Sequence, residues 1–353
     1  MKVSVVVPTY NERENIHELL SRISRALDGF EYEVVVVDDN SPDGTAEYAA
    51  ELSAIYPVRL VRREGKLGLT SAVIDGAKVA RGDYVVVMDA DLQHPPEVIR
   101  DLLKKADSCD LVIASRYVEG GGAEGFTFAR RVISLGATYL ARILIPHAKG
   151  VRDPMSGFFL VRRELLKDLK PVMPKGYKVL LEVLAHREGL KICEIPYTFC
   201  SRVRGASKLS RREILNYIKQ LLMLMPDYYK FAVVGASGVA VNLGTVALLE
   251  HVLTVPHVIA SAVGIEVSLT NNFVWNDLWT FRERRGGGWV ARYLKYHLST
   301  LAGNLAQYLA SQAVYYTVLK VPVAAQAVGT VVGYVINYFL SRSYVWKGGS
   351  VSS

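Results

Sequence analysis

The sequence predicts an α/β domain with a mostly parallel sheet, followed by an all-α transmembrane domain of four helices. Two patterns support this. Val-rich apolar runs alternate with helical segments in the first two-thirds of the chain, which is typical of a parallel sheet covered on both faces. From about Phe231 onward the charges become sparse and long apolar stretches follow. The mean hydropathy of +0.18 agrees, because 22% of the residues are charged and the apolar residues must therefore be concentrated in one part.

The elements of the first part follow one another in a regular order. Strands are expected at residues 3–7, 32–39, 58–63, 84–91 and 110–115, with helices at 15–27, from Thr45 onward and at 70–79. In open α/β sheets, ligands bind in the crevice beyond the carboxyl ends of the strands. The residues at those ends are Pro8, Tyr10, Glu12, Asp39, Asp89 and Asp91. We therefore expect them to share one site.

A cluster of polar residues follows the strand at 84–88. Asp89 and Asp91, with the Gln93 amide, supply the hard oxygen ligands that Mg²⁺ and Mn²⁺ prefer when a diphosphate completes the coordination shell. In an extended segment these alternate residues would project to the same side. A solvated acidic turn ahead of a helix near Pro95 explains them equally well, so the residues alone leave both interpretations open. His94 is expected to pack or to form hydrogen bonds.

A glycine-rich run at residues 120–125, "GGGAEG", formally satisfies the dinucleotide-binding pattern G-x-G-x-x-G. However, "RYVE" separates it from the preceding strand, and no acidic residue follows about twenty positions later to bind a ribose. We interpret these glycines as a mobile loop over the reaction centre.

Several segments together resemble a known family: "VVVPTYNERENI", "VVVVDDNSPDGT", "GLTSAVIDGAKVARGDYVVVMDADLQHPPE" and "DPMSGFFLVRRE". They are similar to the inverting, metal-dependent glycosyltransferases with a GT-A fold, and most of all to the dolichol-phosphate mannose synthases. The resemblance covers most of residues 1–210. It implies that Asp89, Asp91 and Gln93 hold Mg²⁺ or Mn²⁺ against the donor diphosphate. It also implies a nucleotide-sugar site formed by Pro8, Tyr10, Glu12, Val37, Asp39, Asp89 and Ala90.

Basic residues after the glycine loop suit a phosphate group. Arg131 and Ser134 are three residues apart and lie on one helical face, where they could hold a phosphate together with Arg116. A resemblance to the family at Arg131 and Ser134 supports phosphate binding by these two residues. For Arg130, a solvated, positively charged helix face is as good an explanation as phosphate binding. Further candidates at the donor are Lys178, with Glu182 on the same predicted helix, and Arg202 and Lys208 in "SRVRGASK", which resembles a segment that closes over the diphosphate.

If the acceptor of the sugar is a lipid phosphate, the reaction needs no general base. A phosphate monoester has its second pKa near 6, so at neutral pH it is mostly a dianion. Catalysis then needs positioning and charge stabilisation, for which we expect Asp91, Arg131, Ser134 and Arg116. Asp153 of "DPMSGF" is expected to shape the cleft.

The resemblance implies transfer of mannose from GDP-mannose to a dolichyl or other polyprenyl phosphate, giving a β-linked product. Transfer from UDP-glucose, and a non-catalytic binder or translocator of lipid-linked sugars, remain alternatives. A processive polysaccharide synthase is disfavoured, because no Q-x-x-R-W follows the catalytic motifs. The net charge of +8 fits a phosphorylated substrate or anionic lipid, and in the absence of recognition motifs we expect no nucleic acid.

The last third contains four stretches near the length that spans a bilayer, at residues 231–253, 258–280, 294–318 and 323–345. Basic residues flank one side and the opposite loops are almost uncharged, which predicts an integral membrane protein with its catalytic domain on the cytoplasmic face. The arrangement resembles the GtrA-type membrane domain. The expected divisions are 1–209 (catalytic), 210–229 (amphipathic, interfacial), 230–348 (membrane) and 349–353 (tail).

Two further expectations concern the membrane part and the cysteines. "NNFVWNDLWTF" and "NYFLSRSYVW" end the second and fourth stretches with Asn272 and Asn337 in register, and Asn242 and Asn304 take comparable places in the first and third. This indicates a duplicated two-helix hairpin. The cysteines, at 109, 193 and 200, form no CxxC pair and are expected to be reduced thiols.

Overall fold

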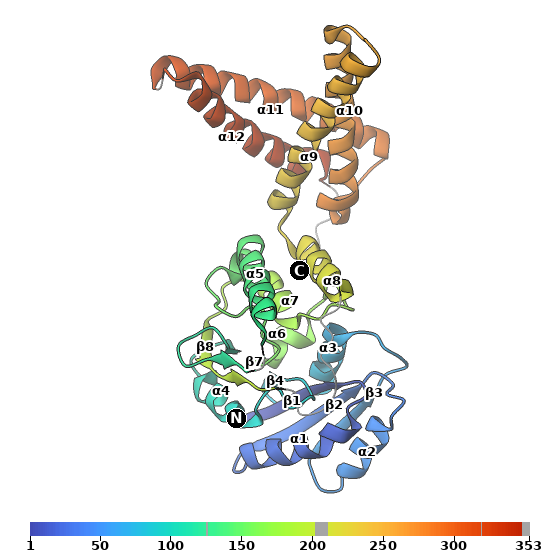
Figure 1. The fold of residues 1–353 in the computed structure, drawn as a ribbon, viewed down its shortest axis with the longest axis vertical. Coiled ribbons are helices and arrows are strands. Elements are labelled where there is room, and N and C mark those ends of the chain that lie inside the picture. Colours follow the sequence, from blue (N-terminus) through green and yellow to red (C-terminus); the bar gives the residue numbers. More distant parts are fainter. Residues whose placement is uncertain (125, 202–210, 319, 348–353) are drawn as a thin grey trace. The chain divides into compact units, whose positions relative to one another are not determined.

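The computed structural model describes residues 1–124, 126–201, 211–318 and 320–347. The chain forms two compact units, Met1–Met225 and Pro226–Ser353, each of which is described by itself (Figure 1). The segment 210–229, expected to be interfacial, is divided between them: α8 (Arg211–Leu224) belongs to the first unit, and α9 (Asp227–Ala247) begins the second.

A seven-stranded sheet in the order β3-β2-β1-β4-β7-β5-β8 forms the centre of the first unit. The strands are β1 (Lys2–Thr9), β2 (Glu31–Asp38), β3 (Val58–Arg62), β4 (Tyr84–Val87), β5 (Leu111–Ser115), β7 (Phe159–Arg162) and β8 (Ile192–Pro196). Every pairing is parallel except those of β7, which runs antiparallel to β4 and β5. The predicted α/β class with a mostly parallel sheet is confirmed.

Helices cover both faces of this sheet (Figure 1). They are α1 (Arg13–Ala26), α2 (Thr45–Leu52), α3 (Leu69–Val79), α4 (Ile99–Ala106), α5 (Phe128–Leu144), α6 (Arg163–Lys167), α7 (Val179–His186) and α8, with short 3-10 turns at η1 (Pro96–Val98) and η2 (Pro146–Ala148). Val5 and Val7 of β1 pack with α1 and α4, whereas Val6 packs with α3 and α7. Because both faces are buried, the strands have continuous apolar runs.

Part of the glycine loop, which was predicted to be mobile, forms a short strand. Within it, β6 (Gly122–Ala123) pairs in parallel with β9 (Thr198–Phe199), and the Gly122 and Glu124 amides donate to the carbonyls of Tyr197 and Phe199. These backbone bonds hold the glycine segment against the residues that precede the Arg202 region. Gly125 lies outside the described residues.

The prediction of reduced thiols is wrong for two cysteines. Cys109, just before β5, and Cys193, in the neighbouring strand β8, form a disulfide with a Cα–Cα distance of 6.1 Å. Local spacing gave no sign of this pair, because the fold brings together residues that are 84 positions apart. Cys200 is a free thiol.

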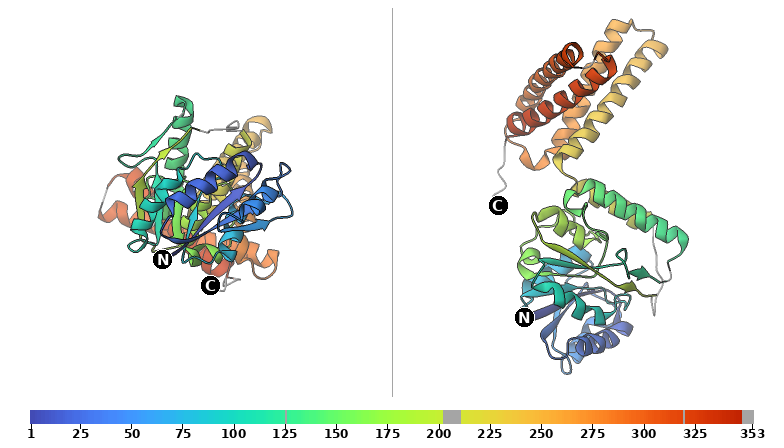
Figure 2. Two further views of the ribbon diagram at one scale, coloured as in Figure 1. Left: turned by 90° about the horizontal axis from the view of Figure 1, so that it is seen from below. Right: turned by 90° about the vertical axis from the view of Figure 1, so that its left-hand side faces the viewer.

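Four long helices form the second unit, as predicted. They are α9, α10 (His257–Trp275), α11 (Trp289–Thr317) and α12 (Pro322–Leu340), with further helical turns at η3 (Leu248–Val252), η4 (Asn276–Thr280), η5 (Arg282–Arg284) and η6 (Ser341–Val345). Helix α9 pairs with α10, and α11 pairs with α12 (Figure 2). Within the described residues, the segments Asp227–Val252 and His257–Thr280 are each long and apolar enough to cross a membrane.

Each hairpin is closed by contacts between a glycine and a side-chain amide. A Cβ on Gly238 of α9 would overlap the Asn272 amide of α10, and one on Gly303 of α11 would overlap the Asn337 amide of α12. Counterparts follow at one constant interval along the chain: Gly238 and Gly303, Asn242 and Gln307, Gly264 and Gly329, Asn272 and Asn337. The pairing of Asn242 with Asn304 is therefore wrong, because Gln307 holds the equivalent position.

A buried ionic cluster joins three segments at one end of these helices. The Asp277 carboxylate in η4 accepts hydrogen bonds from Arg292 Nε at 2.8 Å and from Trp346 Nε1 at 2.9 Å, and Arg285 Nε lies 3.3 Å away. The rings of Phe281 and Trp346 stack at 4.7 Å. The cluster connects the end of the first hairpin to both ends of the second.

A glycine substitution tests the hairpin contact. Gly303→Ala should lower the thermal melting temperature of the detergent-solubilised protein, because the new methyl group meets Asn337 and overpacking costs about 1–3 kcal/mol. Gly244→Ala in α9 is the matched control, since nothing lies within 4 Å of its Cβ position. That change should be neutral or slightly stabilising, because alanine favours helix by about 1 kcal/mol. Equal melting temperatures for the two variants would contradict the described packing.

Candidate active site

The carboxyl ends of β1, β2 and β4 meet at one edge of the sheet, because these strands are parallel neighbours. Pro8 lies opposite Val37 in the ladder. The loops beyond are also joined: the Asn11 amide donates to Ser41 Oγ and the Glu12 amide to Thr45 Oγ1, each at 3.0 Å. The structure thus brings together the strand-end residues predicted to form a nucleotide site.

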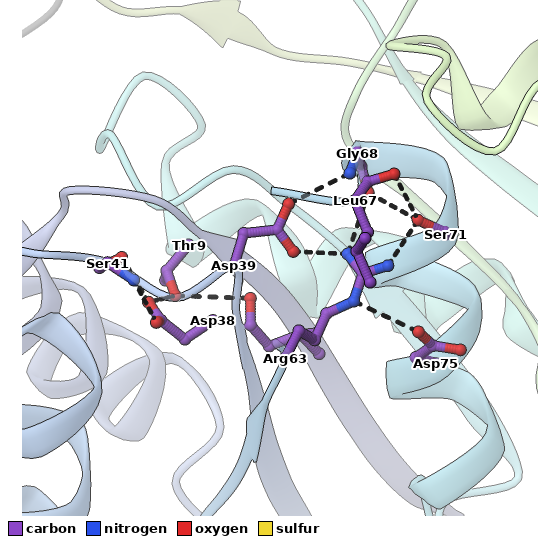
Figure 3. Close-up of polar contacts among 10 residues, drawn as sticks. Thr9, Asp38, Asp39, Ser41, Arg63, Leu67, Gly68, Ser71 and Asp75 are labelled. Carbon is purple, nitrogen blue, oxygen red and sulfur yellow. Dashed lines mark hydrogen bonds and ion pairs between the residues drawn. The ribbon is translucent and has the colours of Figure 1, made fainter. Parts of the chain in front are cut away.

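The two adjacent aspartates after β2 have different surroundings (Figure 3). Asp38 is buried and accepts hydrogen bonds from Thr9 Oγ1 at 2.9 Å and from the Ser41 amide at 2.8 Å. Asp39 is ion-paired with Arg63 and accepts a bond from the Gly68 amide at 3.2 Å. Asp38 therefore holds its own loop, whereas Asp39 connects that loop to the segment before α3.

Arg63 is the centre of this second connection (Figure 3). Besides Asp39, its guanidinium donates to Ser71 Oγ at 2.6 Å and to the Gly68 carbonyl at 3.2 Å, and it lies 3.3 Å from Asp75. The side chain is only 5% exposed. Our sequence interpretation missed Arg63. The signal available was a second arginine directly after an apolar strand.

An exposed aromatic ring lies among the strand-end residues that were predicted to bind a nucleotide. The Tyr10 ring is 38% exposed, and Lys66 Nζ lies 3.8 Å from its centroid. A cation over an aromatic face is stabilising. The pair places a positive charge and a flat ring beside the loops that hold Asp39.

The segment Asp89–Gln93 is bent, which corrects the expectation that its alternate side chains project from an extended chain. Leu92 has a φ of 61°, in the left-handed region, so the chain turns there. The Asp89 side chain remains 44% exposed, whereas Asp91 is buried and accepts a bond from the Gln93 amide at 3.2 Å. The Gln93 side chain donates to the Cys200 carbonyl at 3.1 Å.

The expected packing role of His94 agrees with its position. Its ring lies between Phe158 and Phe199, with centroid distances of 5.2 and 5.3 Å. One ring nitrogen is 3.2 Å from the Tyr197 hydroxyl, and the other is 3.4 Å from Asp89. His94 thereby supports Asp89 from the interior.

The donor set at this strand end fits a hard divalent cation only in part. Among the described residues, no three or more His, Cys, Asp or Glu side chains gather in a metal-holding group. Asp89 and Asp91 contribute carboxylates and Gln93 an amide oxygen, which are ligands suited to Mg²⁺ or Mn²⁺. Since Asp89 is half-exposed, further ligands would come from water or from a bound diphosphate. These three side chains therefore suit a cation that binds together with a diphosphate.

Arg116 and Asp153 form a buried bidentate pair. Both contacts, from Nε and Nη2 to the carboxylate oxygens, measure 2.8 Å, and the Arg116 amide adds a third bond at 3.0 Å. Burial opposes the charge on Arg116, but the hydrogen bonds and charge of Asp153 outweigh it and raise the pKa of Arg116 above its ordinary value. The Asp153 side chain is fully buried, and both of its carboxylate oxygens accept hydrogen bonds from Arg116. This agrees with the expectation that Asp153 shapes the cleft. Of the three guanidinium nitrogens of Arg116, Nε and Nη2 are thus bonded to Asp153.

Lys178 and Glu182 lie in different surroundings. Lys178 Nζ donates to the Met155 carbonyl at 3.2 Å. Its pKa is lowered by burial and then by the charge of Arg116, while Asp89 and Asp153 act in the opposite direction.

Glu182 does not point into the cleft, contrary to expectation. Its fully buried carboxylate accepts bonds from the amides of Val172 and Met173 and from the Gln220 side chain. Burial raises the pKa of Glu182. Its role is to hold the loop before Lys178.

Helix α5 carries the predicted phosphate-binding residues on a largely exposed surface. Arg131 is exposed, and Ser134 Oγ accepts a hydrogen bond from the Tyr117 hydroxyl at 2.8 Å. Arg130 lies over the Phe126 ring, with 4.3 Å to the centroid. Large apolar side chains are also exposed along α5: Phe128, Val132, Ile133, Leu135, Tyr139, Leu140 and Ile143. Arg202 and Lys208 lie outside the described residues.

Comparison with known proteins agrees with this geometry. A family model described as "Glycosyl transferase family 2" matches residues 4–170. The dolichol-phosphate mannosyltransferase of Pyrococcus furiosus is 44% identical, covering 98% of this chain and 99% of its own. The enzyme of the same name from Saccharomyces cerevisiae is 38% identical over 63% of this chain and 86% of its own.

The chain belongs to the dolichol-phosphate mannosyltransferase family. It is a glycosyltransferase, with a GT-A-like first unit. A second family model, "GtrA/DPMS, transmembrane domain", matches residues 230–346 and so spans α9 to α12. Among solved structures, a glucosyl-3-phosphoglycerate synthase of Mycobacterium tuberculosis with Mn²⁺, UDP and phosphoglyceric acid is 26% identical over 62% of this chain and 78% of its own, with a TM-score of 0.49.

For this member of the family, the buried pair at the nucleotide site can be tested directly. Arg63→Met should lower the free energy of unfolding by about 3–5 kcal/mol, because it leaves Asp39 buried without its counter-charge. The neighbouring Arg62→Gln is the control, since Arg62 pairs with Glu47 on the surface, where such pairs contribute about 0–1 kcal/mol. Denaturant unfolding of residues 1–225 within the full chain, followed by tyrosine fluorescence, measures both. Similar losses in the two variants would refute a central role for Arg63.

Proposed function

We propose that the enzyme transfers mannose from GDP-mannose to a dolichyl or other polyprenyl phosphate, with inversion, giving a β-linked lipid-phosphate mannose. The observation that carries the proposal is the 44% identity, over both units, to a relative named dolichol-phosphate mannosyltransferase. The site supports it independently: a strand-end cluster suited to a nucleotide diphosphate lies in the same unit as a helix that carries Arg131 and Ser134.

In this proposal the donor binds at the strand ends. The loops after β1 and β2, held by Asp38 and by the Asp39–Arg63 pair, surround the nucleotide, and Tyr10 offers an exposed ring. Asp89, Asp91 and Gln93 would hold Mg²⁺ or Mn²⁺, which when bound neutralises the charge that develops on the departing diphosphate. Lys178 adds a positive charge near Asp89.

The acceptor chemistry needs little from the protein beyond orientation. A lipid phosphate is mostly a dianion at neutral pH and is already a nucleophile. Arg131 and Ser134 would hold it, and the exposed apolar side chains of α5 suit the surface of a bilayer. Asp153 is fully buried against Arg116, which agrees with a mechanism in which it does not act as the base.

The proposed orientation places the catalytic unit in the cytosol. Basic residues flank the ends of the membrane helices that lead back, along the chain, to the side from which α9 begins: Lys230, Arg282, Arg284, Arg342 and Lys347. The loops at the opposite ends, 253–257 and 318–321, carry little charge, and an excess of basic residues marks the cytoplasmic side. Arg285, Arg292 and Lys295 belong to the same flank in the sequence. Arg285 and Arg292 pair with Asp277, and Arg284 pairs with Asp227.

A donor panel tests the reaction. Purified full-length protein with Mn²⁺ or Mg²⁺ and a short polyprenyl phosphate should transfer sugar fastest from GDP-mannose. Asp91→Asn should lower kcat by at least about a thousandfold, as should a chelator, since charge stabilisation at the leaving group is lost. Asp101→Asn, which removes an exposed acid paired with Lys104, should leave the rate unchanged. Faster transfer from UDP-glucose, or an active Asp91→Asn under chelation, would overturn the assignment.

Neighbouring arginines test the acceptor site. Arg131→Gln should raise the KM for polyprenyl phosphate about 10–100-fold, because a charge-assisted hydrogen bond contributes about 1.5–3 kcal/mol. Arg130→Gln should have a smaller effect, since that guanidinium lies over Phe126. The KM for GDP-mannose should stay constant in both variants. A larger effect at Arg130 than at Arg131 would reverse their assigned roles.

A further inference from the structure

A cavity of about 390 Å³ adjoins the inner side of α5. Its lining residues come from three places: the segment after β5, the second half of α5, and the loop before β7. They are Tyr117, Leu135, Thr138, Tyr139, Arg142 and Arg152. None of them belongs to the predicted donor or acceptor sites.

One buried polar group in this cavity has no partner among the described residues. Thr138 is 5% exposed, and its hydroxyl makes no hydrogen bond. Helical threonines commonly donate to the carbonyl four residues earlier, as Thr245, Thr300 and Thr317 do in this protein. A buried hydroxyl without a partner costs free energy. Because the Thr138 oxygen is closed to water, this hydroxyl lies in the wall of the cavity and is not itself a ligand-binding group.

The charged groups around the cavity favour an anion. Arg142 uses only Nε in a bond to the Lys149 carbonyl, at 3.2 Å, which leaves its terminal amino groups outside that bond. The backbone amide of Arg152 donates to Glu194 at 2.7 Å. The other oxygen of Glu194 accepts from the Asp153 amide at 3.0 Å, so backbone groups already engage both oxygens of the nearest acid. Arg142 and Arg152 thus both line the cavity, and the Glu194 carboxylate next to Arg152 is already hydrogen-bonded to two backbone amides.

The rest of the lining is apolar and open to the surroundings. Leu135 is 47% exposed and Tyr139 is 65% exposed. They continue the exposed apolar surface of α5, on which Ile143 is 43% exposed. A ligand that fills the cavity would therefore combine an anionic head with an apolar chain, which is the chemistry of a lipid phosphate.

The cavity is adjacent to the expected acceptor position but distinct from it. Along α5, Thr138 follows Ser134 by one turn and Arg142 follows Thr138 by another. Tyr117, which lines the cavity, donates its hydroxyl to Ser134 and so stands between the two. The Arg116–Asp153 pair lies next in sequence to Tyr117 and Arg152, on the side of the reaction centre.

We propose that this cavity is a second lipid-phosphate site, which binds the phosphate head group of an anionic bilayer phospholipid beside the acceptor. Arg142 and Arg152 pair with the phosphate, and the acyl chains leave over Leu135 and Tyr139. The proposal goes beyond the transfer reaction and does not require that mannose be the sugar transferred.

Lipid binding to the full-length, delipidated protein in detergent tests the proposal, with dissociation constants measured by native mass spectrometry. The probes are phosphatidylglycerol, phosphatidylcholine, undecaprenyl phosphate and inorganic phosphate. The double variant Arg142→Gln/Arg152→Gln should weaken phosphatidylglycerol binding about tenfold or more, since two charge-assisted contacts are lost. Lys149→Gln, which removes an exposed cation that does not line the cavity, should have no effect.

The outcomes separate the possible sources of the phosphate. Selective loss of phosphatidylglycerol binding, with undecaprenyl phosphate binding retained, supports the second site. Parallel loss of both lipids would assign the cavity to the acceptor and overturn the proposal, as would equal binding by the double variant and by Lys149→Gln, or inorganic phosphate binding as tightly as the lipid. Because binding is measured without a sugar donor, a failure of mannosyl transfer in wild type would refute the proposed reaction and leave this result intact.

Discussion

The buried ion pair between Arg63 and Asp39 is the interaction on which the geometry of the strand-end loops, the proposed donor site, depends. Parallel strands bring their carboxyl ends to one edge, but the loops beyond them have few local restraints. Arg63 supplies these, because one guanidinium joins Asp39, Gly68 and Ser71. Burying two charges is costly unless each is fully bonded. The same cost makes alternative loop arrangements unfavourable, since any of them would leave a buried charge unpaired.

A second buried pair, Arg116 with Asp153, acts in the same way on the segment that follows β5. Together the two pairs remove two acids and two bases from the pool of groups available to substrates. By contrast, the Asp89 side chain is half-exposed and Arg131 is exposed, so both can be reached from solvent. This division agrees with a reaction in which a cation-bound diphosphate leaves and a phosphate attacks, because opposite charges are needed at the two positions.

Local patterns predicted only part of this arrangement. The Val-rich strands were predictable because burial on both faces leaves a continuous apolar run. Strand β7 was missed since "FLVR" is short and its antiparallel place between β4 and β5 depends on distant partners. For the same reason the Cys109–Cys193 disulfide was not predictable. The left-handed turn at Leu92 and the opposite fates of Arg62 and Arg63 follow from tertiary contacts, which residue type does not encode. The roles predicted for the site residues rest on the family resemblance and remain predictions.

The membrane helices associate by a different principle. Lipid is as apolar as leucine, so apolar surface alone gives helices little reason to pair in a bilayer. Here glycines let the backbones approach, and the amides of Asn242, Asn272, Gln307 and Asn337 fill the space they leave. The recurrence of these contacts at one interval supports a duplicated hairpin. Asp277 then fastens the two copies together at one end, where Phe273, Phe281 and Trp346 belong to a buried aromatic cluster. Many of the other large apolar side chains of these helices are exposed and so available to face lipid.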